Sequence, residues 1–194
     1  MKKPIVKLLL KYKHGDFFRR IAVPGNLSLS FLHFAIQTAF GWLNIHEYMF
    51  EGDEKLYTRE GPDGDFAMPG VKYAARTPIE SLLGKKGDRC IYTYDLGDDN
   101  EVDVVCEGRV EHLEDVEFDV KGPDLIEDSA AFGFTEGIVE LLGKKRRSKR
   151  AAECVKWLAE AHGLAPENVL RTPSEPEMAV RVVRLVNFVL NSIP

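Results

Sequence analysis

Apolar residues in the first 60 positions form short runs that predict strands and one helix. Residues 4–12 and 17–23 have the pattern of two strands joined by a turn at 13–16. Ser28 is the expected N-cap of a helix that Gly41 ends, because a serine hydroxyl can accept from a free N–H of the first turn. The apolar residues that recur at helical spacing are Leu29, Leu32, Ile36, Ala39 and Phe40. Short strands are expected at 46–51 and 55–58.

The second half of the chain changes from strand patterns to helix patterns. After strands between 90 and 120, helices are expected at 132–142, 151–162 and 175–190. The last of these begins with Ser174-Glu-Pro-Glu177, a capping box. Strands that precede helices favour an α+β fold: a mostly antiparallel β-sheet with an early helix packed on it and a C-terminal helical cluster. We expect one domain over 1–194, with 144–194 as a helical extension packed on it.

The stretch from Ile91 to Val105 has five carboxylates between two apolar runs and predicts a β-hairpin with a solvated tip. Its tyrosines and valines share one face only if the connection has an odd number of residues. A shift of the strand pairing by one residue would move every side chain of one strand to the opposite face. A loop at 98–100 meets this condition, with Asn100 in the left-handed conformation. This loop pairs Leu96 with Val102.

The same register sets Asp95 opposite Asp103 on the other face, and like charges directly across a strand pair are destabilising. Two interpretations follow. If that face is solvated, water screens the two carboxylates. If it is covered, the pair needs a cation, such as Arg19, Arg20, a lysine or a metal ion.

Composition narrows the class of protein. The chain has 194 residues, of which 44% are hydrophobic and 29% charged, as in soluble globular proteins. Its net charge of -5 argues against a general nucleic-acid binder, although a local basic patch remains compatible with it. Three cysteines without a CxxC pattern favour a reducing compartment. With no signal peptide and no membrane segment expected, we predict a cytoplasmic protein.

Four stretches share their order and separations with the motifs of one family. They are FFRRIAVP (17–24), LHFAIQTAFGW (32–42), IHEY (45–48) and YDLGD (94–98). In this order they resemble the plasmid pRiA4b ORF-3-like family, whose pattern runs WRRI-x-VP, LH-x-x-IQ-x-AFGW, HLH-x-F, YDFGD-x-W-x-H and PPED-x-GG. The resemblance covers about residues 4–142 and implies no defined activity.

The chain departs from that pattern at two histidines, at the tryptophan, which falls on Asn100, and in the last motif, which is reduced to IEDSAA (126–131). The first histidine of HLH falls on Asn44 and the last histidine of the fourth motif on Val102, while the second histidine of HLH is kept as His46. If the family's histidines and carboxylates bind a ligand together, this chain lacks two imidazoles. The candidate cluster that remains comprises His46, Asp95, Asp98, Glu127 and Asp128.

Three single features have both a structural and a functional interpretation. His33 faces the core side of its helix and is either a hydrogen-bonded core histidine or a ligand. Trp42 is either a packing anchor or a substrate platform. A basic run is either a solvated linker or helix start, or a set of phosphate contacts. It comprises Lys144, Lys145, Arg146, Arg147, Lys149 and Arg150.

Three hypotheses of function remain. The first is a non-catalytic binding or interaction module, because no nucleophile lies in an activation motif and no cofactor or assigned metal is implied. The second is a metal-dependent, hydrolase-like enzyme in which His46 and the carboxylates form the site. The third is a nucleic-acid-associated accessory protein of mobile elements that acts through the basic run. The partner is unassigned; a protein is compatible with the sequence, and nucleic acid is less favoured.

Overall fold

A computed structural model of the chain describes residues 4–63, 69–112, 115–122, 124–125, 156, 159–160, 165, 167 and 171–192. The strands are β1 (Ile5–Tyr12), β2 (Phe17–Pro24), β3 (Tyr48–Gly52), β4 (Lys55–Thr58), β5 (Lys72–Tyr73), β6 (Arg89–Tyr94), β7 (Asn100–Val110) and β8 (Val120–Lys121). The helices are α1 (Leu29–Phe40), α2 (Ile79–Leu82), α6 (Glu175–Ser192) and the 3-10 turns η1 (Gly61–Asp63) and η2 (Ala74–Arg76).

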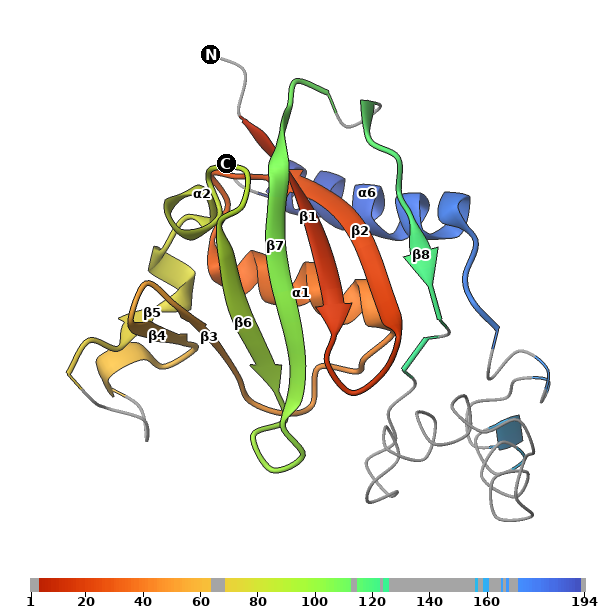
Figure 1. Cartoon of the computed structure of the whole chain (residues 1–194), viewed down its shortest axis with the longest axis horizontal. Helices are drawn as coiled ribbons and strands as arrows, with labels where there is room; N and C mark the ends of the chain where they lie inside the picture. Colours follow the sequence, from red (N-terminus) through yellow and green to blue (C-terminus); the bar gives the residue numbers. More distant parts are fainter. Residues whose placement is uncertain are drawn as a thin grey trace.

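The described strands form one sheet in the order β5-β4-β3-β6-β7-β1-β2-β8. Every neighbouring pair is antiparallel except β4 and β5, which are parallel. Helices α1 and α6 lie on the same side of this sheet (Figure 1). The α+β class and the mostly antiparallel sheet predicted from the sequence are therefore confirmed. The helices expected at 132–142 and 151–162 lie almost entirely outside the described residues.

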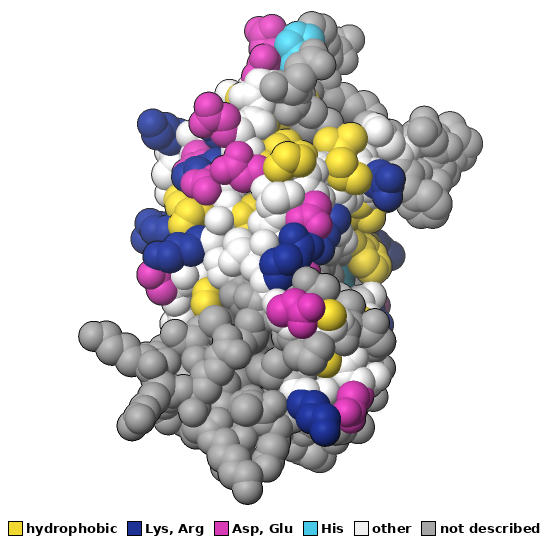
Figure 2. All heavy atoms as spheres, turned by 90° about the vertical axis from the view of Figure 1, so that its right-hand side faces the viewer, with side chains coloured by type: hydrophobic (Ala, Val, Ile, Leu, Met, Phe, Trp, Pro, Cys, Tyr) yellow, Lys and Arg dark blue, Asp and Glu magenta, His cyan; other side chains and the backbone are white. Residues whose placement is uncertain are grey.

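Charges of both signs are interspersed on the side of the molecule that carries β8 and the start of α6 (Figure 2). Hydrophobic side chains are scattered between them on this side. In the described part of the chain, no helix is both long enough and apolar enough to cross a membrane.

Local chemistry sets the ends of the two longer helices as predicted. The Ser28 hydroxyl accepts from the N–H of Phe31 at 3.3 Å, and Gly41 ends α1 in the left-handed conformation with φ of 76°. Ser174 and Glu177 form the capping box of α6: the N–H of Ser174 donates to the Glu177 carboxylate at 2.7 Å, and the N–H of Glu177 donates to the Ser174 hydroxyl at 3.4 Å.

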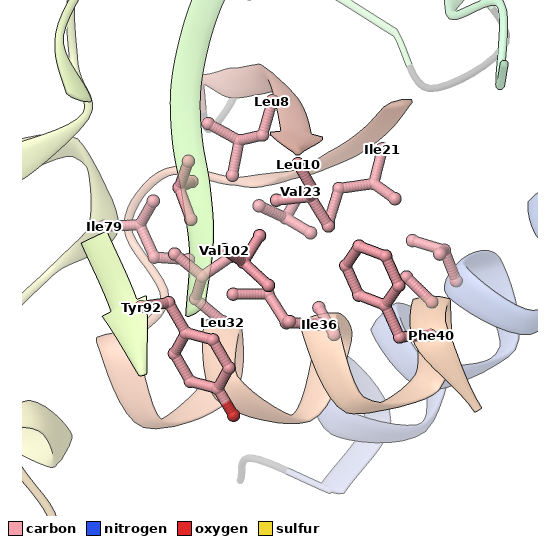
Figure 3. Packing of buried hydrophobic residues seen from close by; sticks show 14 of the residues in the cluster. Leu8, Leu10, Ile21, Val23, Leu32, Ile36, Phe40, Ile79, Tyr92 and Val102 are labelled. Carbon is pink, nitrogen blue, oxygen red and sulfur yellow. The ribbon is translucent and has the colours of Figure 1, made fainter. Parts of the chain in front are cut away.

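The core lies between the helices and one face of the sheet (Figure 3). Leu8 and Leu10 of β1 are fully buried with Leu32 and Ile36 of α1, whereas Leu9, one position out of phase, is only half-buried. This alternation is typical of an antiparallel sheet with one covered and one solvated face. The burial of Val102 in the same cluster agrees with its expected packing role.

The pairing of β6 with β7 corrects the predicted register. Tyr94 pairs with Asn100 and Tyr92 with Val102, so the connection is the five residues 95–99 rather than 98–100. The expected contact between Leu96 and Val102 is therefore wrong. Five is also an odd number, so the tyrosines and valines share the buried face as expected.

The register of β6 against β7 depends on a contact between residues that are far apart in the sequence. Asn100 is buried within β7, and its amide oxygen accepts from the Tyr12 hydroxyl at 2.8 Å. It therefore cannot serve as the left-handed residue of the connection, and Asp95 and Asp99 have positive φ instead. Asp103 pairs with Ile91 and Lys11, so the expected juxtaposition with Asp95 does not occur.

Arg19 of β2 is fully buried and binds three backbone carbonyls. Its guanidinium donates to the oxygens of Ala39, Phe18 and Lys121 at 2.8, 3.0 and 2.8 Å. Burial lowers the pKa of Arg19 to about 10, so the group stays protonated at neutral pH. The bond to Ala39 connects β2 with the last turn of α1.

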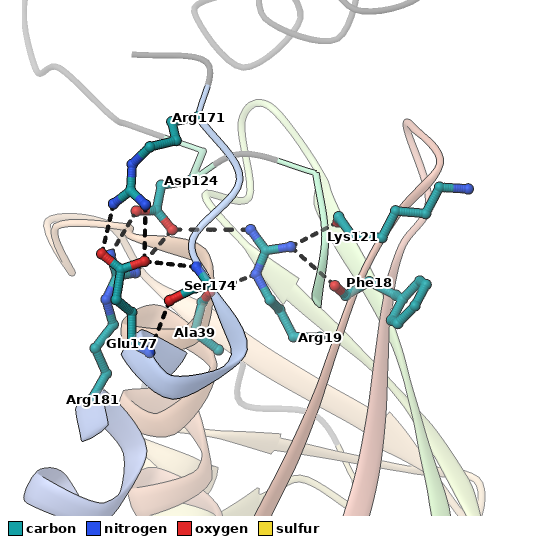
Figure 4. A network of polar contacts seen from close by, with 9 residues as sticks. All are labelled: Phe18, Arg19, Ala39, Lys121, Asp124, Arg171, Ser174, Glu177 and Arg181. Atoms are coloured by element: carbon teal, nitrogen blue, oxygen red, sulfur yellow. Dashed lines mark hydrogen bonds and ion pairs between the residues drawn. The ribbon is translucent and has the colours of Figure 1, made fainter. Parts of the chain in front are cut away.

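Asp124 extends this network to α6 (Figure 4). One of its oxygens lies 4.0 Å from the guanidinium of Arg19, and both accept from Arg181 at 2.9 Å. The next residue, Leu125, donates its N–H to the carbonyl of Phe40 at 2.7 Å. Residues 124–125 therefore connect β2 and α6 with the last turn of α1.

We expect Arg19→Met to lower the free energy of unfolding by about 3 kcal/mol, because three buried carbonyls lose their donor. Arg20→Met is the matched control. Its guanidinium pairs with Glu107 and Asp119 on the half-exposed face, so its loss should change stability by less than about 1 kcal/mol. Urea unfolding followed by circular dichroism measures both, and equal losses would contradict the role assigned to Arg19.

Candidate functional site

The segment that follows α1, residues 41–47, is attached to the helix through Gln37. The Gln37 carbonyl accepts from the N–H groups of Gly41 and Trp42 at 2.9 and 3.0 Å. Its side-chain oxygen accepts from the N–H of Asn44 at 2.9 Å. The left-handed conformation of Asn44, with φ of 58°, turns the chain so that this bond forms.

The same segment is attached to the sheet through Tyr94 of β6. The Tyr94 hydroxyl accepts from the N–H groups of Ile45 and His46, at 2.9 and 3.3 Å. The residues that follow α1 are thus held by one glutamine of the helix and one tyrosine of the sheet.

His33 completes a closed ring of four hydrogen bonds with Asn44, Gln37 and Tyr92. Its Nε2 lies 2.6 Å from the Asn44 amide oxygen, which only accepts, so Nε2 carries the hydrogen. Nδ1 then accepts from the Tyr92 hydroxyl at 2.7 Å, and that hydroxyl accepts from Gln37 Nε2 at 2.9 Å. Asn44 closes the ring by donating to Gln37.

Burial keeps His33 neutral, as this ring requires. Desolvation lowers the pKa of His33 to about 4, although its bond to Asn44 acts in the opposite direction. The imidazole of His33 also stacks on the aromatic ring of Tyr48, with their centroids 3.7 Å apart. The interpretation of His33 as a hydrogen-bonded core histidine is confirmed.

The acidic connection between β6 and β7 is a compact turn built on Asp95. The Asp95 carbonyl accepts from the N–H groups of Asp98 and Asp99, at 3.1 and 2.8 Å. One oxygen of its carboxylate accepts from the N–H of Gly97 at 3.2 Å. The other lies 3.5 Å from Nε2 of His46. Asp95 therefore shapes the turn and also faces His46.

The turn between β1 and β2 supports the acidic connection from the other side. His14 Nε2 lies 2.9 Å from the Asp99 carbonyl, so this nitrogen donates. Lys13 bonds Glu101 through its backbone N–H, at 2.9 Å, and through its ammonium group, at 3.0 Å. Three loops thus meet at one end of the sheet.

Trp42 lies beneath these loops, in a cluster of aromatic rings. Its ring centroid is 5.2 Å from those of Phe40 and Tyr94 and 6.2 Å from that of Tyr12. The side chain is 6% exposed, which favours its interpretation as a packing anchor. Its indole N–H has no hydrogen-bond partner among the residues that the structure describes.

Only part of the cluster predicted from the sequence can be located. His46 and Asp95 come together, and Asp98 lies exposed in the same turn. Glu127 and Asp128 lie outside the described residues, as does the whole basic run from Lys144 to Arg150. Among the described residues, no group of three histidine, cysteine or acidic side chains is placed to hold a metal ion.

Sequence reasoning missed the neutral partners in this region. Gln37 and Tyr94 hold the segment 41–47 through their side chains, and Tyr92 bonds both His33 and Gln37. One signal was available, since Gln37 follows His33 by four positions and therefore shares its helix face.

The motif residues described above thus lie together at one end of the sheet. Along the chain, the motifs follow the order of the family pattern. Residues 4–170 match the family model of the plasmid pRiA4b ORF-3-like protein. The chain belongs to this family. The match extends beyond residue 142, where the resemblance seen in the sequence ended.

Two further proteins are similar to this chain. The chain is 32% identical over 94 residues to the uncharacterized protein y4hQ of Sinorhizobium fredii (strain NBRC 101917 / NGR234). That match covers 48% of this chain and 47% of the relative, so it spans about half of either protein. The structure also resembles the crystal structure of a protein of unknown function, MM3350, from Methanosarcina mazei Go1. The TM-score is 0.66 at 24% identity, over 91% of this chain and 98% of that one, which shows a shared fold.

We expect stability to depend on pH through His33. Its pKa is about 4 in the folded protein and 6.5 unfolded, so the unfolded chain binds more protons between these values. Stability is therefore complete above pH 6.5 and falls as the pH drops towards 4. Between pH 7 and 5 the loss due to His33 should be about 2 kcal/mol.

His33→Gln should remove this part of the pH dependence, as measured by urea unfolding at pH 7 and pH 5. Ile36→Val is the control. It changes a buried neighbour on the same helix, should destabilise by about 1 kcal/mol, and should keep the wild-type dependence on pH. An unchanged pH dependence in His33→Gln would show that His33 does not stay neutral in the fold.

Proposed function

We propose that this protein is a non-catalytic binding or interaction module. The observation that carries the proposal is that the polar motif side chains are engaged within the fold. His33 and Gln37 are bonded to Tyr92 and Asn44, and Tyr94 holds Ile45 and His46. A catalytic site needs such groups directed at a reacting atom.

The cysteines support the same conclusion. Cys90 and Cys106 are buried beneath the sheet, and desolvation raises the pKa of both thiols. A buried thiol with a raised pKa holds little thiolate, which is the nucleophilic form. Neither residue is therefore suited to nucleophilic attack at neutral pH.

The contact of His46 with Asp95 supports the alternative of a metal-dependent, hydrolase-like enzyme. An imidazole and a carboxylate oxygen 3.5 Å apart supply two potential ligands, whereas a catalytic zinc site takes three from the protein. The third ligand would have to come from Asp98, or from Glu127 or Asp128, which lie outside the described residues. The binding-module proposal requires that this site remain without metal.

Metal titration separates these two functions. For a binding module, calorimetry with Zn²⁺ or Mn²⁺ at pH 7 should show no saturable site that depends on His46 and Asp95. Wild type, Asp95→Asn and His46→Ala should then give the same isotherm. Asp99→Asn is the matched control, because it removes one charge from the same turn and asparagine tolerates its positive φ. One-to-one binding that weakens tenfold in both test variants, but not in the control, would establish the metal site.

The basic run supports the third function, a nucleic-acid accessory protein. If it contacts phosphates, four such contacts should weaken DNA binding roughly a hundredfold between 50 and 200 mM salt. The serine variant of Lys145, Arg146, Arg147 and Lys149 should then lose both the binding and its salt dependence. Fluorescence anisotropy with a labelled duplex measures this, and binding that ignores salt would exclude the route.

Two other expectations remain proposals. We infer a cytoplasmic location from the sparse cysteines, of which the two in the described part of the chain, Cys90 and Cys106, are free. We also propose that residues 1–194 form one domain with 144–194 packed on it, which the contacts of α6 with α1 and β2 support.

A further inference from the structure

Three large hydrophobic side chains are exposed on α1 and in the segment that follows it. Phe34, Leu43 and Ile45 are 46%, 50% and 48% exposed, and we name them the apolar patch. The hydrogen bond between His33 and Asn44 places the two backbone segments that carry them side by side, because each of the three is the chain neighbour of one of these two residues. Large apolar side chains gathered at the surface are typical of interaction sites.

The segment that carries the apolar patch is held in one conformation. The N–H groups of Asn44, Ile45 and His46 all donate to side chains of α1 or β6. Asn44 adopts a left-handed conformation, and such backbone geometry persists only where the surroundings enforce it. A surface fixed in this way loses little conformational entropy when a partner binds.

An acidic border adjoins the apolar patch. The N–H of Asp95 donates to the Glu47 carbonyl at 3.0 Å, which brings the acidic turn beside residues 45–47. The turn holds Asp95, Asp98 and Asp99, and Glu47 adds a fourth carboxylate. Arg59 pairs with Glu47 and neutralises one of these four carboxylates, which leaves the border with an excess of negative charge.

We propose that the apolar patch and the acidic turn form a docking surface for a peptide segment with large apolar side chains flanked by lysine or arginine. This inference rests on the proposed binding function and identifies its surface and partner. The apolar side chains of the segment cover the patch, and its basic residues approach Asp98 and Asp99. Such complementarity accelerates association and selects against acidic partners.

Phage display with a random linear peptide library, panned on the full chain, tests the proposal. Enriched peptides should combine at least two large apolar residues with two or more lysines or arginines. Phe34→Ser/Ile45→Ser should weaken their binding at least tenfold. Val180→Ser is the matched control, because Val180 is 47% exposed but lies on α6, and it should leave the affinity within twofold of wild type. Asp98→Asn should weaken binding severalfold at low salt and reduce its dependence on salt.

The possible outcomes separate a failure of the docking surface from a failure of the proposed binding function. Peptides that bind the double variant as tightly as wild type would overturn the docking surface and leave the binding module intact. Enriched peptides rich in aspartate and glutamate would overturn the assigned partner. A library that yields no specific binder would overturn both. If melting curves show that the double variant fails to fold, Ile45→Ser alone gives the test, because the Ile45 contact with Tyr94 is made by its backbone.

Discussion

One closed ring of hydrogen bonds fixes the end of the molecule where the family motifs meet. His33, Asn44, Gln37 and Tyr92 each donate once and accept once, through bonds of 2.6 to 2.9 Å. The ring joins α1, the segment after it and β6, and it works only with a neutral imidazole. Loss of the side chain of His33, Gln37 or Tyr92 removes one of the two ring bonds of each neighbour, and an unmet buried donor or acceptor is more destabilising than a missing bond between two apolar groups. This stabilising role accounts for motif residues, such as His33 and Gln37, whose polar side chains are buried.

The elements that the sequence predicts well are those defined by local rules. Both β1 and β2 need only a pattern and a turn, and α1 needs only Ser28, its apolar spacing and Gly41. The connection after β6 was mispredicted because its register depends on the bond between Tyr12 and Asn100, which are 88 positions apart. A loop of three residues and a loop of five residues both satisfy the same alternation of buried and exposed side chains. The sequence therefore determines the faces of the strands, and the long-range bond determines the register.

The candidate site was only partly predictable for a related reason. Residue type directed attention to His46 and the carboxylates, since these groups titrate or bind metals. The geometry of the region is set instead by Tyr92, Tyr94 and Gln37, whose hydroxyl and amide groups accept or donate without titrating. Their importance comes from burial next to backbone groups of another segment. No feature of a tyrosine in an alternating strand indicates that its hydroxyl will meet an N–H of a distant loop.

The departures from the family pattern can now be given a physical meaning. At position 44 an asparagine stands where the motif has histidine, and it supplies both a left-handed backbone and a permanent acceptor for His33. At position 102 a valine fills the fully buried core under α1 (Figure 3). Each replacement puts a side chain that does not titrate where the motif has an imidazole. Asn44 lies between Leu43 and Ile45, so the residue that fixes this segment to His33 does not titrate. This arrangement supports the proposed binding function of the surface.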